Sequence, residues 1–225
     1  MKVIVFAKSK GGVSASTLLY NLATYAASQG RGVLIGDLDP QGSVRKMWTL
    51  SKELVNPRLV KMKPHGVIES INLLTSAGYD KDFMFIDTPG SMFPVIRESV
   101  RTADLVILPT LPNPVDLDAQ EDVINIVDEE GKRACSLFVL TKTEGGKGPR
   151  QLVENAKEFL KPYARHPVQE MPQRIDYARA AETGTAGWQV SKLCKADIKK
   201  IWEAMLSVMN DQAKKERTDV AKAIH

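Results

Sequence analysis

Short runs of consecutive apolar residues recur along the chain, and segments with helical spacing of apolar positions separate them. A continuous apolar run, unlike an alternating one, is typical of a strand that is covered on both faces, as in a parallel sheet. We therefore expect five strands, at Val3–Ala7, Gly32–Asp37, Phe83–Asp87, Leu105–Thr110 and Ser136–Thr141.

The intervening segments carry helical patterns. We expect helices at Thr17–Ser28, Val95–Arg101, Ala119–Glu129, Gln151–Phe159, Ile175–Ala181 and Lys195–Met209, the last followed by a charged tail at Lys214–Lys222. Alternation of strand and helix predicts an α/β fold, a mostly parallel twisted sheet with helices on both faces. Neither an internal repeat nor a linker interrupts the pattern, so we expect residues 1–225 to form one domain.

Composition adds few constraints. The chain has 225 residues and a formal net charge of +4, a mild excess that fits either a solvated surface or a polyanionic partner. Its cysteines, Cys135 and Cys194, are expected to be free thiols in a reducing compartment. The N-terminal apolar run is too short for a signal peptide, so we expect a cytoplasmic protein.

A glycine-rich segment, KSKGGVSAST, joins the first expected strand to the first expected helix. Gly11 and Gly12 let backbone N–H groups turn toward phosphate oxygens, and the helix adds its positive N-terminus. Ser16 or Thr17 is placed to hold Mg²⁺, although a serine here also fits a simple helix cap on a tight turn. Such phosphate loops carry a lysine immediately before the hydroxyl residue, and here that position is Ala15.

Carboxylates follow two other expected strands. Asp37 ends the second strand and Asp39 follows two residues later; the two carboxylates can hold a metal-bound water, although Asp-Pro and Gln-Gly steps also form turns. Asp87 ends the third strand and fits a Mg²⁺ ligand that acts through water. Ligands bind at the carboxyl ends of parallel strands, so we expect these groups to converge with the glycine-rich segment.

Taken in order, several segments resemble those of the ParA/MinD/VirC1 family of deviant Walker ATPases, over roughly residues 2–185. The strongest matches are KGGVSAST at 10–17 to the family's KGGVGKTT loop, GDLDPQGS at 36–43 to its second motif, and FIDTPGS at 85–91 to its Walker B segment. Weaker matches are residues 103–116 to its fourth strand and following loop, and MPQR at 171–174 to its adenine-side segment.

The resemblance implies a P-loop NTPase fold, ATP or ADP with Mg²⁺ as cofactors, and a homodimer that encloses two ATP molecules. Lys10 would be the signature lysine that reaches the partner's nucleotide, with Asp39 and Asp37 as further catalytic candidates. Expected metal ligands are Ser16, Asp39 and Asp87. Expected nucleotide contacts are Lys10, Gly11, Gly12, Val13, Ser14, Ala15, Ser16, Thr17, Met171, Pro172 and Arg174.

The sequence departs from the family pattern at Ser14, which replaces a glycine, and at Ala15, which replaces the phosphate-binding lysine. A glycine there would suit a positive φ, so Ser14 is expected to strain or reshape the loop. Three outcomes remain open: a slow ATPase that uses Lys10 and also Lys8, a switch that binds ATP without hydrolysing it, and a pseudo-ATPase that survives as an interaction module. Retention of three carboxylates favours the first two.

Lysines gather at the start of the last expected helix, where helical spacing puts most of them on one broad face: Lys192, Lys195, Lys199 and Lys200. A solvated helix face is one explanation, and the resemblance favours a surface that contacts DNA without sequence preference.

Within the family, the resemblance is strongest for plasmid-partition and cargo-positioning members. It implies a nucleoid-associated protein with a ParB-like or other cargo-adaptor partner that stimulates hydrolysis. A VirC1-like accessory role in DNA transfer is the alternative. The polar ending, KKERTDVAKAIH, argues against a membrane anchor, and two separated cysteines argue against a cluster-bearing metabolic ATPase.

Overall fold

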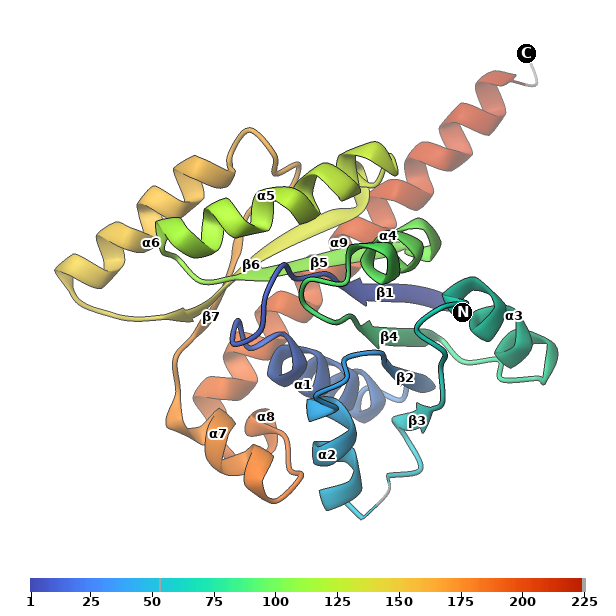
Figure 1. The fold of residues 1–225 in the computed structure, drawn as a ribbon, viewed down its shortest axis with the longest axis horizontal. Helices are drawn as coiled ribbons and strands as arrows, with labels where there is room; N and C mark the ends of the chain where they lie inside the picture. Colours follow the sequence, from blue (N-terminus) through green and yellow to red (C-terminus); the bar gives the residue numbers. More distant parts are fainter. Residues whose placement is uncertain (53, 224–225) are drawn as a thin grey trace.

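The computed structural model describes residues 1–52 and 54–223, without the side chains of residues 215–217 and 219–223. Within these residues, seven strands form one parallel sheet in the order β3-β2-β4-β1-β5-β6-β7 (Figure 1). The strands are β1 (Lys2–Phe6), β2 (Val33–Asp37), β3 (Arg58–Val60), β4 (Phe83–Asp87), β5 (Leu105–Thr110), β6 (Ser136–Thr143) and β7 (Gln169–Pro172).

All five expected strands are present, and their apolar runs are buried on both faces, which confirms the parallel α/β prediction. The sequence pattern missed β3 and β7, which are the two edge strands. Both are short, and neither is buried along its whole length, so neither needs a continuous apolar run.

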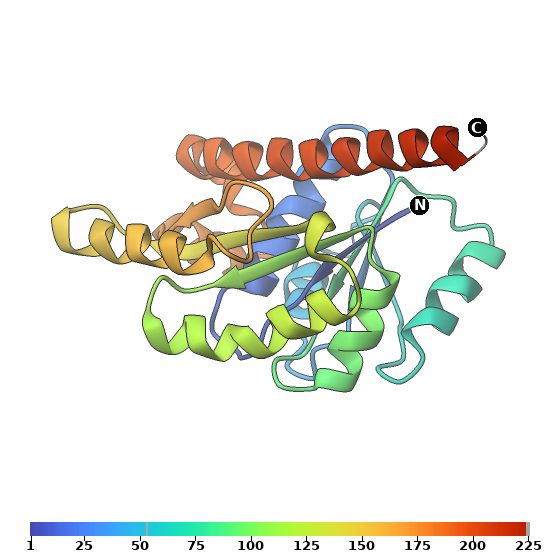
Figure 2. The same cartoon turned by 90° about the horizontal axis from the view of Figure 1, so that it is seen from above.

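Helices cover both faces of the sheet, as expected. One face carries α1 (Ala15–Ser28), α2 (Ser43–Leu50), α7 (Ile175–Glu182), α8 (Gly187–Val190) and α9 (Lys192–Ala223). The other face carries α3 (Val67–Ser76), α4 (Phe93–Thr102), α5 (Pro114–Glu129) and α6 (Lys147–Leu160), and a short 3₁₀ turn, η1 (Arg133–Cys135), precedes β6. Figure 2 shows α9 along one face and the helices α4 and α5 on the other.

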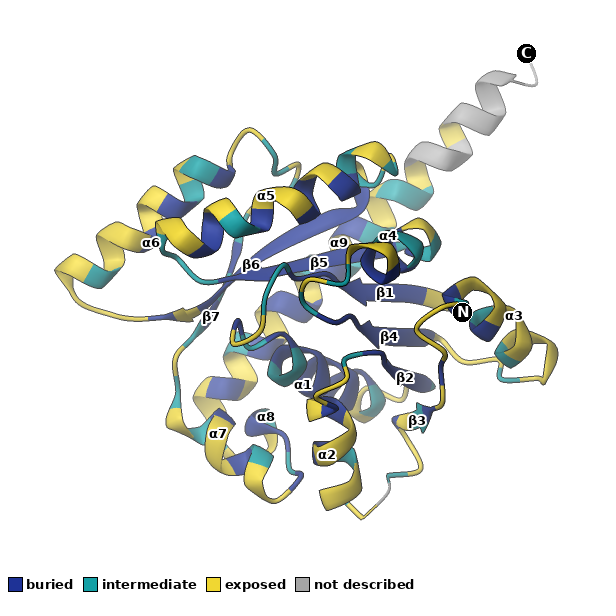
Figure 3. Cartoon of the chain, viewed as in Figure 1, coloured by how far each residue is buried: buried dark blue, intermediate teal, exposed yellow. Residues whose placement is uncertain are grey.

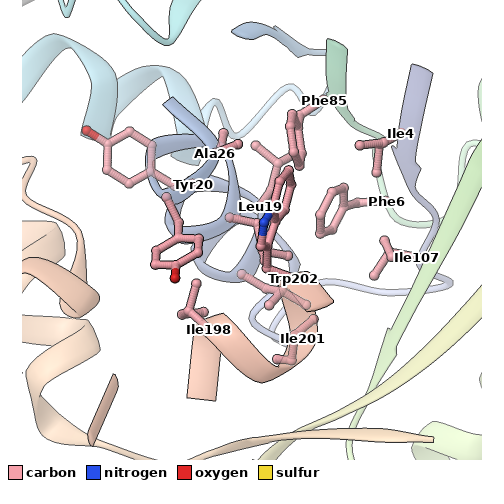
Figure 4. Packing of buried hydrophobic residues seen from close by; sticks show 14 of the residues in the cluster. Ile4, Phe6, Leu19, Tyr20, Ala26, Phe85, Ile107, Ile198, Ile201 and Trp202 are labelled. Carbon is pink, nitrogen blue, oxygen red and sulfur yellow. The ribbon is translucent and has the colours of Figure 1, made fainter. Parts of the chain in front are cut away.

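The strands and the inner sides of the helices form the buried layer of the molecule (Figure 3). On the α1 face, Trp202 of α9 packs edge-on against Phe83 of β4, with ring centroids 5.4 Å apart. Figure 4 shows Trp202, Ile198 and Ile201 of α9 beside Leu19 and Tyr20 of α1. This packing joins the C-terminal helix to the helix that follows the glycine-rich loop.

The helix boundaries differ from expectation chiefly at the C-terminus. The last helix begins at Lys192 rather than Lys195 and continues to Ala223, so the expected charged tail is helical as far as that residue. The side chains of Lys215 and Arg217, and residues 224–225, lie outside the described part. No helix in the described ranges is long and apolar enough to cross a bilayer.

Candidate functional site

The carboxyl ends of β1, β2 and β4 meet at one edge of the sheet. In the strand register, Asp87 of β4 lies opposite Phe6 of β1 and opposite Asp37 of β2. The glycine-rich loop leaves β1 at this edge and enters α1 at Ala15. The expected convergence of strand-end carboxylates and loop is therefore confirmed.

Three features shape the glycine-rich loop: the backbone conformation of Ser14, a hydrogen bond from Thr141 and the close approach of Gly90. Ser14 has φ 55° and ψ 21°, so it adopts the left-handed conformation that glycine accepts most readily. The hydroxyl of Thr141, on β6, donates to the carbonyl of Val13 at 2.9 Å. Gly90 leaves room for the loop, because a Cβ there would lie 2.8 Å from the backbone of Lys10. The strain expected at Ser14 is present, and the turn that a glycine would make is retained.

The loop lines a hollow of about 300 Å³, here called the phosphate-side hollow. Its lining residues are Lys8, Gly11, Gly12, Val13, Ser14, Ala15, Ser16, Thr17, Asp39, Gln41 and Ser43. All the expected loop residues except Lys10 belong to it. Backbone N–H groups at the start of α1 and the helix dipole favour an anion at this place.

Lys8 lies between two of the expected carboxylates. Its Nζ is 2.6 Å from Oδ1 of Asp87 and 3.1 Å from Oδ2 of Asp39. The hydroxyl of Ser16 donates to Oδ2 of Asp87 at 2.6 Å, so both oxygens of this fully buried carboxylate are occupied. Burial raises the pKa of Asp87, and the ammonium of Lys8 and the hydroxyl of Ser16 oppose that rise.

Asp37 holds the loop after β2 instead of joining this cluster. Its Oδ1 accepts the backbone N–H of Asp39 at 3.1 Å, and its Oδ2 accepts that of Arg45 at 2.9 Å, near the start of α2. Burial raises the pKa of Asp37, and the N–H of Arg45 opposes the rise. Asp37 thus acts as a turn-forming residue, as the turn interpretation of this segment predicted. Asp39 instead lines the phosphate-side hollow. A catalytic role for Asp37 stays a prediction.

Lys10 points away from the phosphate-side hollow, toward α5. Its Nζ is 2.8 Å from Oδ1 of Asp116, whose side chain is 8% exposed. That oxygen has no hydrogen-bond partner among the described residues, so the contact is a charge pair without aligned geometry. The expected signature lysine is therefore held within its own chain.

A second hollow of about 280 Å³, the base-side hollow, lies beside the first. Its lining residues are Ser14, Thr17, Lys142, Met171, Pro172, Gln173, Arg174, Ile175, Tyr177 and Ala178. It contains the expected nucleotide contacts Met171, Pro172 and Arg174. Because Ser14 and Thr17 line both hollows, the two lie side by side.

Sequence reasoning missed several residues of this site. Lys142 lies in β6, beside the irregularity between Thr141 and Thr143, and the strand-end rule applied to β6 could have found it. Asp197 of α9 binds both Nε and Nη2 of Arg174, at 2.5 and 3.1 Å. No local sequence pattern predicts an ion pair between two residues that are 23 positions apart. This pair links the base-side hollow to the helix that carries the lysine cluster.

The donor groups present suit Mg²⁺ only together with a nucleotide. Among the described residues, no group of three or more His, Cys, Asp or Glu side chains could hold a metal. Ser16, however, lines the phosphate-side hollow, and its hydroxyl donates to the buried carboxylate of Asp87 behind it. Mg²⁺ commonly takes one or two such ligands and completes its shell with phosphates and water.

The four lysines expected to contact DNA are all exposed on the first part of α9: Lys192, Lys195, Lys199 and Lys200. Lys199 has an exposed ion pair with Glu203 at 3.6 Å. A pair of this kind is weak and leaves the lysine available to another partner.

Comparison with solved structures places the fold. The chain matches the MinD cell division protein of Aquifex aeolicus with a TM-score of 0.74 and 17% identity, over 92% of this chain and 98% of that one. It matches a plasmid partition protein of Borrelia burgdorferi B31, bound to AMPPNP, with a TM-score of 0.66 and 20% identity, over 94% and 99% of the two chains. At these identities the likeness shows the fold alone.

Sequence comparison adds relatives. The chain is 29% identical over 161 residues to maintenance of carboxysome distribution protein A of Halothiobacillus neapolitanus, covering 69% of this chain and 71% of that protein. It is 30% identical over 132 residues to protein ParA of Rhizobium radiobacter, covering 58% of each. The model of the CobQ/CobB/MinD/ParA nucleotide binding domain matches residues 4–186. With the phosphate loop and strand-end aspartates in place, this chain belongs to that family of ParA/MinD-type Walker ATPases.

Proposed function

We propose that this protein binds ATP or ADP in the two hollows and uses the bound nucleotide as a switch for positioning a cargo. The observation that carries the proposal is that the two hollows are adjacent and share Ser14 and Thr17 as lining residues. One end offers backbone N–H groups and a helix N-terminus to phosphates. The other offers the apolar wall of Met171, Pro172 and Tyr177 to a base.

Magnesium would accompany the nucleotide in this proposal. The hydroxyl of Ser16 would bind the ion directly, and Asp87 would bind it through water, while the phosphates supply the remaining ligands. Asp39, at the rim of the phosphate-side hollow, would hold the water that attacks the terminal phosphate. When bound, the ion would supply positive charge that offsets the charge of the phosphates.

The ATP-bound form is proposed to be a homodimer. Lys10 would leave Asp116 and contact the partner's phosphates, where a second positive charge reduces the repulsion between two nucleotides. The dimer would bind DNA without sequence preference through the lysines of α9. In support, one structure with this fold, at 13% identity, is described as pNOB8 ParA bound to nonspecific DNA.

The cargo is proposed to be a plasmid or a protein assembly, by analogy with the names of the relatives, which include ParA and a carboxysome distribution protein. A ParB-like or other adaptor protein would stimulate release from the nucleoid, and the protein would act in the cytoplasm. A VirC1-like role in DNA transfer shares the same site and is the alternative within this class.

Hydrolysis is proposed to be slow. Ala15 contributes no charge to the phosphates, and loss of one such contact costs on the order of a hundredfold in rate. A pseudo-ATPase is the second candidate, and Ala15 is the observation that favours it. Phosphate release separates the two. We expect measurable, slow turnover in the parent, a partial gain in Ala15→Lys, and a larger gain in Ser14→Gly/Ala15→Lys.

Calorimetric titration with Mg·ATP and Mg·ADP tests nucleotide binding directly. Thr17→Phe should block binding, because Thr17 lines both hollows. Thr75→Phe is the matched control, since Thr75 is exposed on α3, away from the site. Absence of saturable heat from the folded parent at millimolar nucleotide would rule the proposal out.

A further inference from the structure

The ammonium of Lys8 is the buried cation of the site. Its side chain is 4% exposed, and it contacts Asp87, which is 0% exposed, and Asp39, which is 14% exposed. A lysine is rarely buried to this degree without a partner, because removing the charge from water is costly. Here the two carboxylates provide that compensation.

The backbone on either side of Lys8 is fixed by one glutamine. Gln120 of α5 is 1% exposed, and its side-chain amide donates to the carbonyl of Ala7 at 3.2 Å. Its Oε1 accepts the backbone N–H of Ser9, also at 3.2 Å. The backbone around Lys8, at the start of the glycine-rich loop and just after β1, is therefore held by α5.

Lys8 also lies beside the position of the missing loop lysine. It lines the phosphate-side hollow together with Ala15, and no other basic side chain lines that hollow in the described part of the chain. Lys10 is paired with Asp116 instead. Without Lys8, a triphosphate in the hollow would lie beside Asp39, with the buried charge of Asp87 behind the wall and no lysine to offset either.

We propose that Lys8 is the resident cation of the phosphate site, which replaces the absent loop lysine from the end of β1. This inference rests on the proposed nucleotide binding. With one positive charge against two carboxylates, Lys8 offsets half of the negative charge of Asp87 and Asp39 at the wall of the hollow. Because Lys8 supplies part of the charge compensation at this site, nucleotide binding should depend less on free Mg²⁺ with Lys8 present than without it.

The consequence is a specific dependence on divalent ions. In the parent, the dissociation constant of ADP should differ by less than about tenfold between excess Mg²⁺ and EDTA. In Lys8→Met, that ratio should rise by about tenfold or more, since a charged contact is lost and the two carboxylates lose their counter-charge. A merely structural role for Lys8 would weaken binding equally in both conditions.

The test is calorimetric titration with ADP in Mg²⁺ and in EDTA on four proteins: the parent, Lys8→Met, Lys8→Met/Ala15→Lys and Lys161→Met. Ala15 lines the same hollow, so a lysine there should return most of the EDTA affinity that Lys8→Met loses. Lys161→Met removes an exposed lysine that pairs with Glu158 and lines neither hollow, and it should keep the parent's ratio. An unchanged ratio in Lys8→Met, or no recovery in the double variant, overturns the proposal.

Two further measurements cover the cases in which Lys8→Met does not fold or the parent binds no nucleotide. If Lys8→Met does not fold, Lys8→Gln, which keeps a hydrogen-bond donor for Asp87 without the charge, takes its place with the same expectation. If the parent binds no nucleotide, the proposed function fails. The charge-compensating role of Lys8 is then tested by the effect of Mn²⁺, without nucleotide, on thermal unfolding. Thermal unfolding of Lys8→Met should then shift upward with millimolar Mn²⁺ while that of the parent does not, and an equal response overturns the inference.

Discussion

Lys10 and Asp116, 106 positions apart in the chain, form an ion pair of 2.8 Å between the glycine-rich loop and α5. The charge that the family resemblance assigns to a partner subunit is thus held in place within one subunit. If Lys10 crosses to a second nucleotide, it must first leave Asp116. The pair is therefore a competitor of the proposed dimer contact.

Lys10→Ala should abolish ATP-dependent dimerisation while leaving folding and much of the nucleotide affinity intact, since Lys10 does not line the phosphate-side hollow. Asp116→Asn should instead promote dimerisation, because it frees Lys10. Light scattering with and without ATP measures both effects. DNA binding should follow the dimer, because two basic surfaces add avidity. A dimeric Lys10→Ala that binds DNA like the parent would remove the cross-subunit role.

Ser14→Gly should stabilise the fold. Ser14 has φ 55°, a conformation that costs a residue with a Cβ about 1 kcal/mol relative to glycine. Chemical denaturation should show an increase in the free energy of unfolding that is smaller than this, because glycine also gains freedom in the unfolded chain. Ser207→Gly is the control, because Ser207 is exposed within α9 and the change there should cost about 0.5 kcal/mol. Equal losses at both positions would contradict the strain argument.

The pattern of apolar runs predicted the parallel sheet because each central strand is buried on both faces and needs an unbroken run. It failed at the edges, where β7 reads Gln169-Glu170-Met171-Pro172 and only alternate residues are buried. It also missed α2, which buries only Val44 and Met47 and so carries few apolar positions.

The residues of the phosphate loop could be read from the sequence, but the partners of its lysines could not. Lys8 and Lys10 are two residues apart, yet one pairs with Asp87 and the other with Asp116. Those partners come from different elements, β4 and α5, which lie far away in the chain. Only the arrangement of elements around β1 decides which carboxylate each lysine meets.

Gly90→Ala should lower nucleotide affinity without unfolding the protein. The added Cβ would lie 2.8 Å from both Cα and C of Lys10 and 3.1 Å from the N of Gly11. Because these are backbone atoms, the glycine-rich loop itself must shift. Its N–H groups would then no longer point toward the proposed phosphate position. We expect at least about a tenfold weaker dissociation constant for ADP by calorimetry.

The control for that substitution is Gly148→Ala, because a Cβ at Gly148 meets nothing within 4 Å. Gly148 lies within α6, where alanine is favoured over glycine, so nucleotide affinity should be unchanged and stability should rise slightly. Unchanged ADP affinity in Gly90→Ala would show that the approach of this turn to the loop is not needed.

Cys194 should resist thiol reagents in the folded protein. It is fully buried on α9, and burial raises the pKa of its thiol above the ordinary value of 9.0. The folded chain therefore keeps a proton that the unfolded chain releases, so this group's contribution to stability is complete below about pH 9 and is lost above it. Ellman's reagent at pH 8, applied to Cys135→Ser, should label Cys194 only after denaturant is added; rapid labelling of the native protein would contradict this burial.

The lysines of α9 separate DNA binding from dimerisation. Lys199→Ala/Lys200→Ala should spare ATP-dependent dimerisation and lower DNA affinity at low salt, because both lysines are exposed and distant in sequence from the phosphate loop. If both contact phosphates, the slope of log affinity against log salt should become shallower by up to about 2 per subunit.

Lys157→Ala/Lys161→Ala is the matched control, since it removes Lys157 of α6 and Lys161 at the C-cap of α6, on the opposite face of the sheet. It changes the net charge by the same amount, and it should leave the salt slope of DNA binding as in the parent. Fluorescence anisotropy with a labelled duplex over a series of salt concentrations measures both variants. Equal losses in the two variants would mean that net charge, and not the face formed by α9, governs the contact with DNA.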